Sequence, residues 1–565
     1  MARQSLYGVP VRSRPPSQES ILVIEPTLGL DVASAPMNLK PGASPAADNY
    51  ILREGALEPR PMLTLTAPDS QPFASSPVLG GFEVVDVTGL RYPLTSTSTL
   101  LAYRSGVNTW SRLSYVPAYG LNDPPSGSTV SYWDIAQIYD PIADQNLAIA
   151  ANGSYQSLYA WKAGTAVFSS LTGAPAALYV ESFDNYLLAF NLKAPTGNHL
   201  VQRVQWSDRG SSSSWTGGLS GFEDLLDMRG QGTRIIGQDN RLLLFSEYEI
   251  WQGTEANFPF VFSFGPLDRN IGTPYSWTIC KTPIGLMFLA RDLNIWWLPK
   301  SGGPAKQVGD AIWRFLRLNI DVPERAWATY DSNSNQYQLY YAVKGGKGYP
   351  QRALYLDLTG SLGALTTGTF YGALSSPPNW APQSFDIVSG GLSLTRGFEA
   401  NLPASGGTTW SQLSAAQITW NQLGMSWSQL AGNATPWQRA TFVGSSSGSV
   451  FYLNSNATSD NGTPVVSYWQ THALGGGSPD RQKTITAVRV DYQATSSSSV
   501  TVQASDDVGE TFQVGLGMSL PASSVASQVR ADVYAAARYP VVKVSSQGFR
   551  YRIQRLWATI RTQGR

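Results

Sequence analysis

Residues 178–190 read LYVESFDNYLLAF, in which two apolar runs, Leu178–Val180 and Tyr186–Phe190, flank the dipeptide Asp184-Asn185. Asp and Asn are favoured in tight turns because they tolerate left-handed backbone and hydrogen-bond to it locally. Short apolar runs bounded by such residues are typical of paired antiparallel strands. This stretch therefore predicts a β-hairpin.

The same pattern recurs on both sides of this hairpin. The turn aspartates at 140, 184, 239, 292 and 331 follow one another after 44, 55, 53 and 39 residues. Units of about 40–50 residues, each a β-meander, are typical of propeller blades. The paired runs are Leu100–Tyr103 with Trp110–Leu113, Gln137–Tyr139 with Leu147–Ala150, Arg234–Ile236 with Leu242–Phe245, Leu286–Ala290 with Ile295–Leu298, and Trp327–Tyr330 with Tyr337–Val343. We predict a degenerate β-propeller body over residues 81–400, favoured over a sandwich, with the number of blades left open.

Three further segments flank this body. Residues 1–80 are rich in proline, which fixes the backbone and cannot enter a central strand, so we expect an extended arm with one strand-like run at Ile21–Ile24. Residues 401–436 repeat Trp-x-Gln-Leu at 410, 420 and 427, and we interpret them as loops pinned onto a β surface, with sugar stacking as the alternative. Residues 437–565 alternate apolar and polar positions, which predicts an antiparallel β-sandwich.

Local signals within these segments predict individual elements. Asp310 is a suitable N-cap, and Ile312, Phe315 and Leu316 share one helical face, so we expect a helix over 310–317. The sandwich strands are expected at Thr484–Tyr492, Ser499–Ala504, Val541–Ser545 and Tyr551–Ile560, preceded by a hairpin of Thr441–Gly444 and Val450–Leu453. Together these features predict an all-β protein.

The composition excludes several classes of protein. Among 565 residues only 14% are charged, against about a quarter in a typical soluble domain. The formal net charge is +1, so no global field attracts nucleic acid or acidic substrates. Cys280 is the single cysteine, which excludes an intramolecular disulfide and a thiolate metal cluster. The apolar runs are strand-sized, so we expect no membrane insertion, and folding in a reducing cytoplasm is the simple inference.

Catalytic motifs are missing from the sequence. Its two histidines, His199 and His472, are far apart and stand in no recognisable catalytic motif. No Walker-type loop, strand-linked Gly-x-Gly-x-x-Gly or calcium loop occurs. We therefore predict no catalytic residues, no cofactor, no metal and no enzymatic activity. Glycoside hydrolysis needs only two carboxylates, so a glycan-cleaving propeller is the main alternative.

One motif of sialidase propellers does occur, in the C-terminal region. Residues 505–512, SDDVGETF, fit the Ser-x-Asp-x-Gly-x-Thr-aromatic pattern of the Asp-box. In that motif the carboxylate ties down turn amides and the aromatic ring packs beneath, and the motif is not a catalytic site. We interpret it as a structural turn formed by Ser505, Asp507, Gly509, Thr511 and Phe512.

The last 36 residues are locally basic. Arg550, Arg552 and Arg555 are expected on one strand with partly alternating faces. Such a row can contact DNA phosphates or an acidic partner surface, and the alternative is a solvated sandwich face.

Two regions resemble a known family. The first is Pro26–Leu30 followed by Lys40–Gly42, Asn49-Tyr50 and Arg53–Pro61, which resembles the opening arm of phage tail hub and nozzle proteins. The second runs from Arg203–Asp208 through Leu242–Trp251, Gly272–Pro283, Phe288–Leu298 and Gln307–Leu316, and its order is similar to the packaged-DNA stabilisation (tail hub) family of short-tailed bacteriophages. The arm departs from the family pattern in having Met62 where a glycine usually follows Pro61.

This resemblance implies a function for the chain. The family forms a ring, a hexamer, beneath the head-to-tail adaptor protein, where it continues the channel for double-stranded DNA and closes it before ejection. The expectations are a virion tail protein assembled in the host cytoplasm, whose arm clasps the adaptor or a neighbouring subunit and to which tail fibres can attach. The alternatives are a glycan-cleaving tailspike and a glycan-binding adhesin without turnover.

Overall fold

The computed structural model describes residues 18–67, 70–106, 109–118, 122–141, 144–256, 260–358, 380–385, 393–402, 438–475 and 480–562. These residues divide into two compact units. One unit comprises residues 60–465, and the other joins residues 1–59 to residues 466–565. The chain is all-β, with one α-helix among the described residues.

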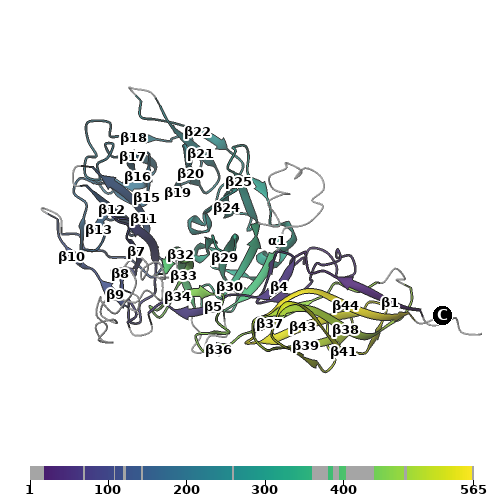
Figure 1. Cartoon of the computed structure of the whole chain (residues 1–565). Helices are drawn as coiled ribbons and strands as arrows, with labels where there is room; N and C mark the ends of the chain where they lie inside the picture. The colour runs from purple at the N-terminus through teal and green to yellow at the C-terminus, as the bar shows by residue number, and fades with distance from the viewer. Residues whose placement is uncertain are drawn as a thin grey trace, which may run out of the picture. The chain divides into compact units, whose positions relative to one another are not determined.

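The unit of residues 60–465 is a β-propeller. Its described residues form seven antiparallel sheets that follow one another along the chain and around a central axis (Figure 1). The first four sheets are β6–β9 (Gly80–Val85, Arg91–Ser96, Leu101–Gly106, Thr109–Arg112), β11–β14 (Asp134–Asp140, Gln145–Ala151, Tyr159–Lys162, Val167–Ser170) with β10 (Ser114–Val116) parallel to β14, β15–β18 (Ala176–Phe183, Tyr186–Lys193, His199–Trp206, Gly221–Asp224) and β19–β22 (Gly232–Gln238, Arg241–Ser246, Ile250–Glu255, Phe262–Asp268).

The remaining three sheets complete the ring. They are β23–β26 (Cys280–Thr282, Gly285–Leu289, Ile295–Pro299, Lys306–Gln307), β28–β31 (Trp327–Asp331, Gln336–Val343, Arg352–Asp357, Trp380–Ser384) with β27 (Ile320–Asp321) beside β29, and β32–β34 (Leu394–Leu402, Gln438–Ser445, Val450–Asn454) with β5 (Met62–Leu65). The short helices η1 (Ser276–Thr278), α1 (Asp310–Asn319) and η2 (Pro323–Arg325) and the small hairpin β35–β36 (Ser459–Asp460, Thr463–Pro464) lie between strands in the chain.

Hydrophobic cores fill the space between neighbouring blades. Leu188 and Phe190 of β16 pack with Leu242 and Leu244 of β20 in one cluster. Strand β16 is buried on both faces along almost its whole length, which is why its sequence is a continuous apolar run and not an alternating one. Strands of this kind are apolar throughout because both of their faces are buried between blades. These are the long apolar runs that predicted a propeller.

The ring is closed by a strand from the N-terminal side of the unit. Strand β5 pairs with β34, from Met62 opposite Asn454 to Leu65 opposite Phe451, as the outermost strand of the seventh blade. On the inner side, the backbone N–H and side-chain amide of Asn401 (β32) donate to the Glu83 carboxylate (β6) at 2.7 and 2.8 Å. The seventh blade is therefore tied to the first in two ways. Its innermost strand, β32, bonds to β6, and its outermost strand, β5, is supplied by the segment that leads into β6.

A buried ion pair lies beside β5. The guanidinium of Arg60 and the carboxylate of Asp460 are at most 1% exposed and form two hydrogen bonds. The Asp460 carboxylate also accepts from the backbone N–H of Leu63 at 2.7 Å. The Arg60 guanidinium stacks over the Phe385 ring at 4.1 Å. This pair ties the start of β5 to the hairpin that follows β34.

The predicted hairpins all occur, but not at the same place in each blade. Asp184 and Asp239 connect the first two strands of their blades, with left-handed backbone as expected (φ 47° and 51°). Asp292 instead connects the second and third strands, β24 and β25. Asp292 therefore divides the 92 residues from Asp239 to Asp331 unevenly, whereas the 55 residues from Asp184 to Asp239 reflect the long connection of residues 207–220 between β17 and β18.

The helix occurs with a different N-cap. It begins at Asp310 and ends at Asn319, and Gly309 is the N-cap without a side-chain hydrogen bond. The Asp310 carboxylate instead accepts from the Asn294 side-chain amide at 3.0 Å, so the N-cap prediction was wrong. Ile312 and Leu316 are buried as expected.

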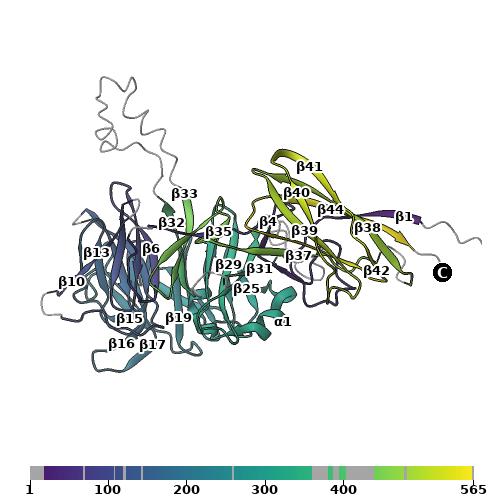
Figure 2. The ribbon, with the colours of Figure 1, turned by 90° about the horizontal axis from the view of Figure 1, so that it is seen from below.

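The second unit is an antiparallel β-sandwich, coloured largely yellow and green in Figure 2. Its apolar core includes Ile24, Trp469, Val490, Val502 and Ile553. One sheet contains β1 (Gln18–Ile24), β3 (Tyr50–Arg53), β4 (Ala56–Pro59), β38 (Lys483–Ala494), β41 (Ser523–Ala531), β42 (Ala535–Ala537) and β44 (Arg552–Thr562). The other contains β2 (Ala47–Asp48), β37 (Val466–Gln470), β39 (Ser498–Ser505), β40 (Leu516–Leu520) and β43 (Val541–Gln547).

The domain boundaries differ from those predicted. The described part of the expected arm, residues 18–59, supplies four strands to the sandwich, and the sandwich proper begins at 466 and not 437. The hairpin β33–β34 belongs to the propeller. Long-range pairing decides both boundaries, and local composition does not reveal it. The Trp-x-Gln-Leu segment lies outside the described residues.

Replacing Asp460 with Asn should destabilise the propeller by about 3–5 kcal/mol, because the charge of Arg60 is then buried without a partner. Denaturant unfolding followed by tryptophan fluorescence measures this effect. Of the 18 tryptophans only Trp469 and Trp557 lie outside residues 60–465, so the signal reports mainly on the propeller.

The matched control is Asp239→Asn, which removes the same charge from an exposed ion pair with Lys300 in the same unit and should cost at most about 1 kcal/mol. Equal effects of the two substitutions would contradict a special role for the buried pair.

Candidate functional site

The propeller encloses a central cavity of about 480 Å³. Every blade contributes to its wall through the first strand of its sheet, or through β32 in the seventh blade. Its charged residues are Asp134, Glu181, Arg234, Lys281, Arg396 and Glu399. The cavity is the place where residues from distant parts of the chain converge, and it is the candidate site.

An ion pair between blades two and four forms one side of this cavity. Asp134 (β11) and Arg234 (β19) are 2.9 Å apart, and the other Asp134 oxygen accepts from the backbone N–H of Val180 at 3.1 Å. Burial raises the pKa of Asp134 and outweighs the effect of Arg234, which lowers it. Burial likewise raises the pKa of Glu181 (β15), whose closest cation is Lys281 (β23) at 3.6 Å.

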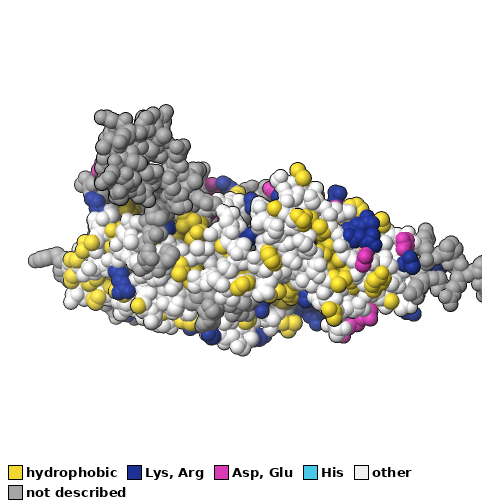
Figure 3. Space-filling model, turned by 60° about the horizontal axis from the view of Figure 1, so that its bottom comes forward, with side chains coloured by type: hydrophobic (Ala, Val, Ile, Leu, Met, Phe, Trp, Pro, Cys, Tyr) yellow, Lys and Arg dark blue, Asp and Glu magenta, His cyan; other side chains and the backbone are white. Residues whose placement is uncertain are grey.

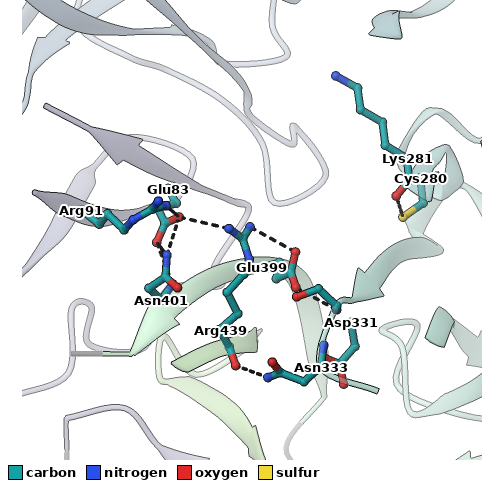
Figure 4. Close-up of polar contacts among 10 residues, drawn as sticks. Glu83, Arg91, Cys280, Lys281, Asp331, Asn333, Glu399, Asn401 and Arg439 are labelled. Carbon is teal, nitrogen blue, oxygen red and sulfur yellow. Dashed lines mark hydrogen bonds and ion pairs between the residues drawn. The ribbon is translucent and has the colours of Figure 1, made fainter. Parts of the chain in front are cut away.

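Glu399 (β32) lies in a second charge network (Figure 4). The Arg439 guanidinium lies between two carboxylates, with Glu399 at 3.1 Å and Glu83 at 3.8 Å. Glu399 also accepts from the backbone N–H of Ser332 at 2.9 Å, and Glu83 pairs with Arg91 at 2.8 Å. These contacts link blades one, six and seven, so they serve ring closure.

An adjoining cavity of about 390 Å³ is strongly acidic. It shares Glu181 and Lys281 with the central cavity and adds Asp184, Asp239 and Glu255. Asp184 pairs with Arg209 at 2.6 Å, and Asp239 pairs with Lys300 at 3.0 Å. These carboxylates thus have cationic partners from the chain itself.

The chemistry available in these cavities is limited. Burial raises the pKa of the Cys280 thiol far above its usual range, which leaves it a poor nucleophile. His199 is exposed on β17, and His472 belongs to the sandwich unit, where burial lowers its pKa. Within the described ranges no three His, Cys, Asp or Glu side chains converge as metal ligands. Nor does any described helix have the length and apolarity to cross a membrane.

The three C-terminal arginines contact the N-terminal strands of their own sandwich. Arg552 pairs with Glu54 at 2.7 Å and with Glu58 at 3.0 Å. Arg555 pairs with Glu25 at 2.9 Å, and Arg550 donates to the Pro59 carbonyl at 2.7 Å. In this chain they hold residues 18–59 against β44, and contact with DNA or a partner stays a prediction.

Residues 505–512 form a tight turn after β39. The Ser505 hydroxyl donates to Asp507 at 2.6 Å and accepts from the Gly509 N–H at 2.9 Å, where φ is +93°. The Thr511 N–H donates to both Asp507 oxygens at 2.8 and 2.9 Å, and the Phe512 ring contacts Lys543. The hydrogen bonds from Ser505 and Thr511 hold the pKa of Asp507 well below its usual range.

Sequence reasoning missed all six charged residues of the central cavity. Asp134 and Arg234 are 100 positions apart, and no local motif indicates that they meet. One signal was present: Arg234 opens a predicted hairpin and stands directly before the apolar pair Ile235-Ile236. Aligning the repeats by their first strands would have placed these charges at the axis.

Comparison with known proteins gives distant similarities. No family model and no curated protein matches the chain. Among solved structures, BamB from Moraxella catarrhalis has a TM-score of 0.35 and 9% identity over 78% of this chain and 98% of its own. An exo-β-1,3-galactanase from Phanerochaete chrysosporium has a TM-score of 0.25 and 10% identity over 86% and 100%. A family 43 arabinoxylan arabinofuranohydrolase from Bacillus subtilis has a TM-score of 0.19 and 10% identity over 92% and 96%. Similarities at this level do not bear on function.

Replacing Asp507 with Asn should make the sandwich less sensitive to acid. The lowered pKa of Asp507 means that its stabilising contribution is complete above its unfolded pKa of about 4 and is lost as the pH falls toward the folded value. Thermal unfolding midpoints at neutral and acidic pH should therefore fall less in Asp507→Asn than in the wild type.

Asp506→Asn, one position earlier, removes the same charge without these hydrogen bonds and should keep the wild-type pH dependence. Identical pH profiles for the wild type and Asp507→Asn would contradict the role assigned to this turn.

Proposed function

We propose that this chain is a non-catalytic structural protein of a short phage tail, a nozzle or tail hub. Identical copies form a ring, a hexamer, below the head-to-tail adaptor. The ring continues the DNA channel, retains the packaged DNA and is its ejection path. The resemblance of residues 20–60 and 200–360 to the tail hub family supports this proposal.

The observation that carries the assembly part of the proposal is an uncharged, exposed sheet edge. Residues 511–529 contain no charged side chain, and they include β40 and all but the last two residues of β41, each the edge strand of its sheet. Val514, Val525 and Tyr534 in and beside this segment are 92%, 68% and 63% exposed. Edge strands that stay soluble alone usually carry charge, whereas subunit interfaces are depleted of it.

A second copy of the chain is the occupant that fits this edge. The segment offers no charge for an acidic or basic partner to complement, but it offers apolar side chains and backbone groups at a sheet edge that a different surface of the next copy can cover in the head-to-tail contact that a ring requires. Figure 3 shows one face of the protein on which charged side chains occupy isolated positions among hydrophobic and neutral polar ones. Such a surface suits large permanent contacts.

The charge balance also suits a DNA conduit. The net charge is +1, and the arginines of the C-terminal strand are paired with carboxylates of the same chain. Each neutralised phosphate would add a salt-dependent affinity term that resists sliding. A protein that passes DNA without gripping it needs this near neutrality.

Glycan cleavage is the second candidate function. Asp134 and Glu181 face the same cavity from neighbouring strands, and burial raises the pKa of both. Paired carboxylates with raised pKa values perform acid–base chemistry in glycosidases. The ion pairs of both residues with Arg234 and Lys281 favour the structural role.

Val525→Lys should weaken ring assembly by about tenfold or more in dissociation constant, because a charge then enters an uncharged interface. Mass photometry and negative-stain microscopy of the purified chain measure the ring directly. Val87→Lys, at a 52% exposed turn of the propeller, is the matched control and should leave assembly unchanged.

The proposal fails if the wild-type chain stays monomeric at high concentration, or if Val525→Lys and Val87→Lys behave alike.

The tail role also predicts that the purified chain releases no reducing sugar from bacterial surface polysaccharides. Turnover that disappears in Glu181→Gln, with the wild-type unfolding midpoint retained, would decide for glycan cleavage instead.

A further inference from the structure

Arg396 is a cation in the central cavity, and it forms no ion pair with any carboxylate in the part of the chain that the structure describes. It lines the cavity from β32, and its Nε and Nη1 atoms are enclosed without any hydrogen-bond acceptor. The other cations of the wall are paired, Arg234 with Asp134 and Lys281 with Glu181. Burial lowers the pKa of Arg396 to about 9, so the side chain is still a cation at neutral pH.

The surroundings of Arg396 hold it in place but do not neutralise it. Its guanidinium stacks over the Trp277 ring at 4.0 Å, and Arg234 contacts the same ring at 4.5 Å. Tyr132 packs edge-on against Trp277, and its buried hydroxyl has no hydrogen-bond partner. The guanidiniums of Arg234 and Arg396 therefore contact the same indole ring. Among the described residues, Asp134 is the one carboxylate that forms an ion pair with either guanidinium.

Unsatisfied buried donors are rare in proteins, and a cluster of them requires an acceptor. Here the unmet donors are the Nε and Nη1 nitrogens of Arg396 and the hydroxyl of Tyr132, and of these two residues Arg396 lines the cavity. Around Trp277 two guanidiniums stand beside one paired carboxylate, which leaves a positive charge, so the expected acceptor is an anion. Arg396 lines the cavity, so the side of its guanidinium that faces the cavity is the part that a ligand there reaches.

The rest of the wall narrows the class of anion. Asp134, Glu181 and Glu399 also line the cavity and would repel a ligand with two negative charges, such as phosphate at neutral pH. Their oxygens can accept hydrogen bonds from hydroxyl groups. Phe82, Trp133 and Phe398 provide an apolar wall, and a volume of about 480 Å³ is typical of a small-molecule site.

We infer that the central cavity binds a sugar that carries one carboxylate, with that carboxylate on Arg396 and its hydroxyl groups on the acidic wall. A uronic or sialic acid unit has this combination of one negative charge, several hydroxyl groups and an apolar ring face. The inference concerns the propeller of a single copy and does not depend on ring assembly, so the two proposals fail separately.

Isothermal titration calorimetry of the full chain tests this inference, with glucuronic acid and N-acetylneuraminic acid as probes. At least one of them should bind with a dissociation constant of about 1 mM or tighter, and glucose should bind at least about tenfold more weakly. Inorganic phosphate should also bind at least about tenfold more weakly, because of the acidic wall.

Three variants locate the carboxylate. Arg396→Gln should weaken binding of the acidic sugar by about tenfold or more, and Arg396→Lys should recover only part of the loss because it lacks the planar fork. Arg314→Gln, at an exposed arginine of α1, is the matched control and should bind like the wild type. If Arg396→Gln does not fold, Arg396→Lys keeps the positive charge and should still show a measurable part of the loss.

Three outcomes would overturn the inference: no heat from either acidic sugar, glucose or phosphate binding as tightly as the acidic sugars, or acidic-sugar binding that is unchanged in both Arg396→Gln and Arg396→Lys.

Discussion

A closed ring of blades requires that its first and last sheets meet, and in this chain one short strand satisfies that requirement. Strand β5 completes the seventh blade, and without it β34 would be an open edge. The buried Arg60–Asp460 pair fixes the start of that strand, and Glu83 bonds Asn401 across the inner junction of the same two blades. The central cavity exists only because this closure brings β32 beside β6.

The charge pattern inside the propeller follows from the same geometry. Side chains on the first strands point toward an axis where seven blades converge, so any charge there is partly buried and must find a partner on another blade. Asp134 and Arg234 satisfy each other across blades two and four. Arg396 has no such partner, which makes it the exception that a purely structural account of the cavity leaves unexplained.

Local signals predicted the strands and turns, and they could not predict the contacts between distant segments. Asp184 and Asp239 adopt the left-handed turns that their residue types favour, and β38 alternates buried and half-buried positions as its sequence indicates. The proline-rich N-terminal segment was expected to be an extended arm, yet Glu54 pairs with Arg552 almost 500 residues away, and the strands on either side of Glu54, β3 and β4, lie in one sheet with β44. Charge pairing of this kind depends on the tertiary fold, and a single sequence does not show it.

The sandwich is made from both ends of the chain, and this has a consequence for biosynthesis. Strands β1–β4 leave the ribosome about 400 residues before β37 follows, which is about 20–80 s at 5–20 residues per second. During that interval their apolar side chains lack the partners that later cover them. Nascent chains must therefore be shielded from one another, by chaperones or by sparse loading of ribosomes on the message, until the final hundred residues arrive.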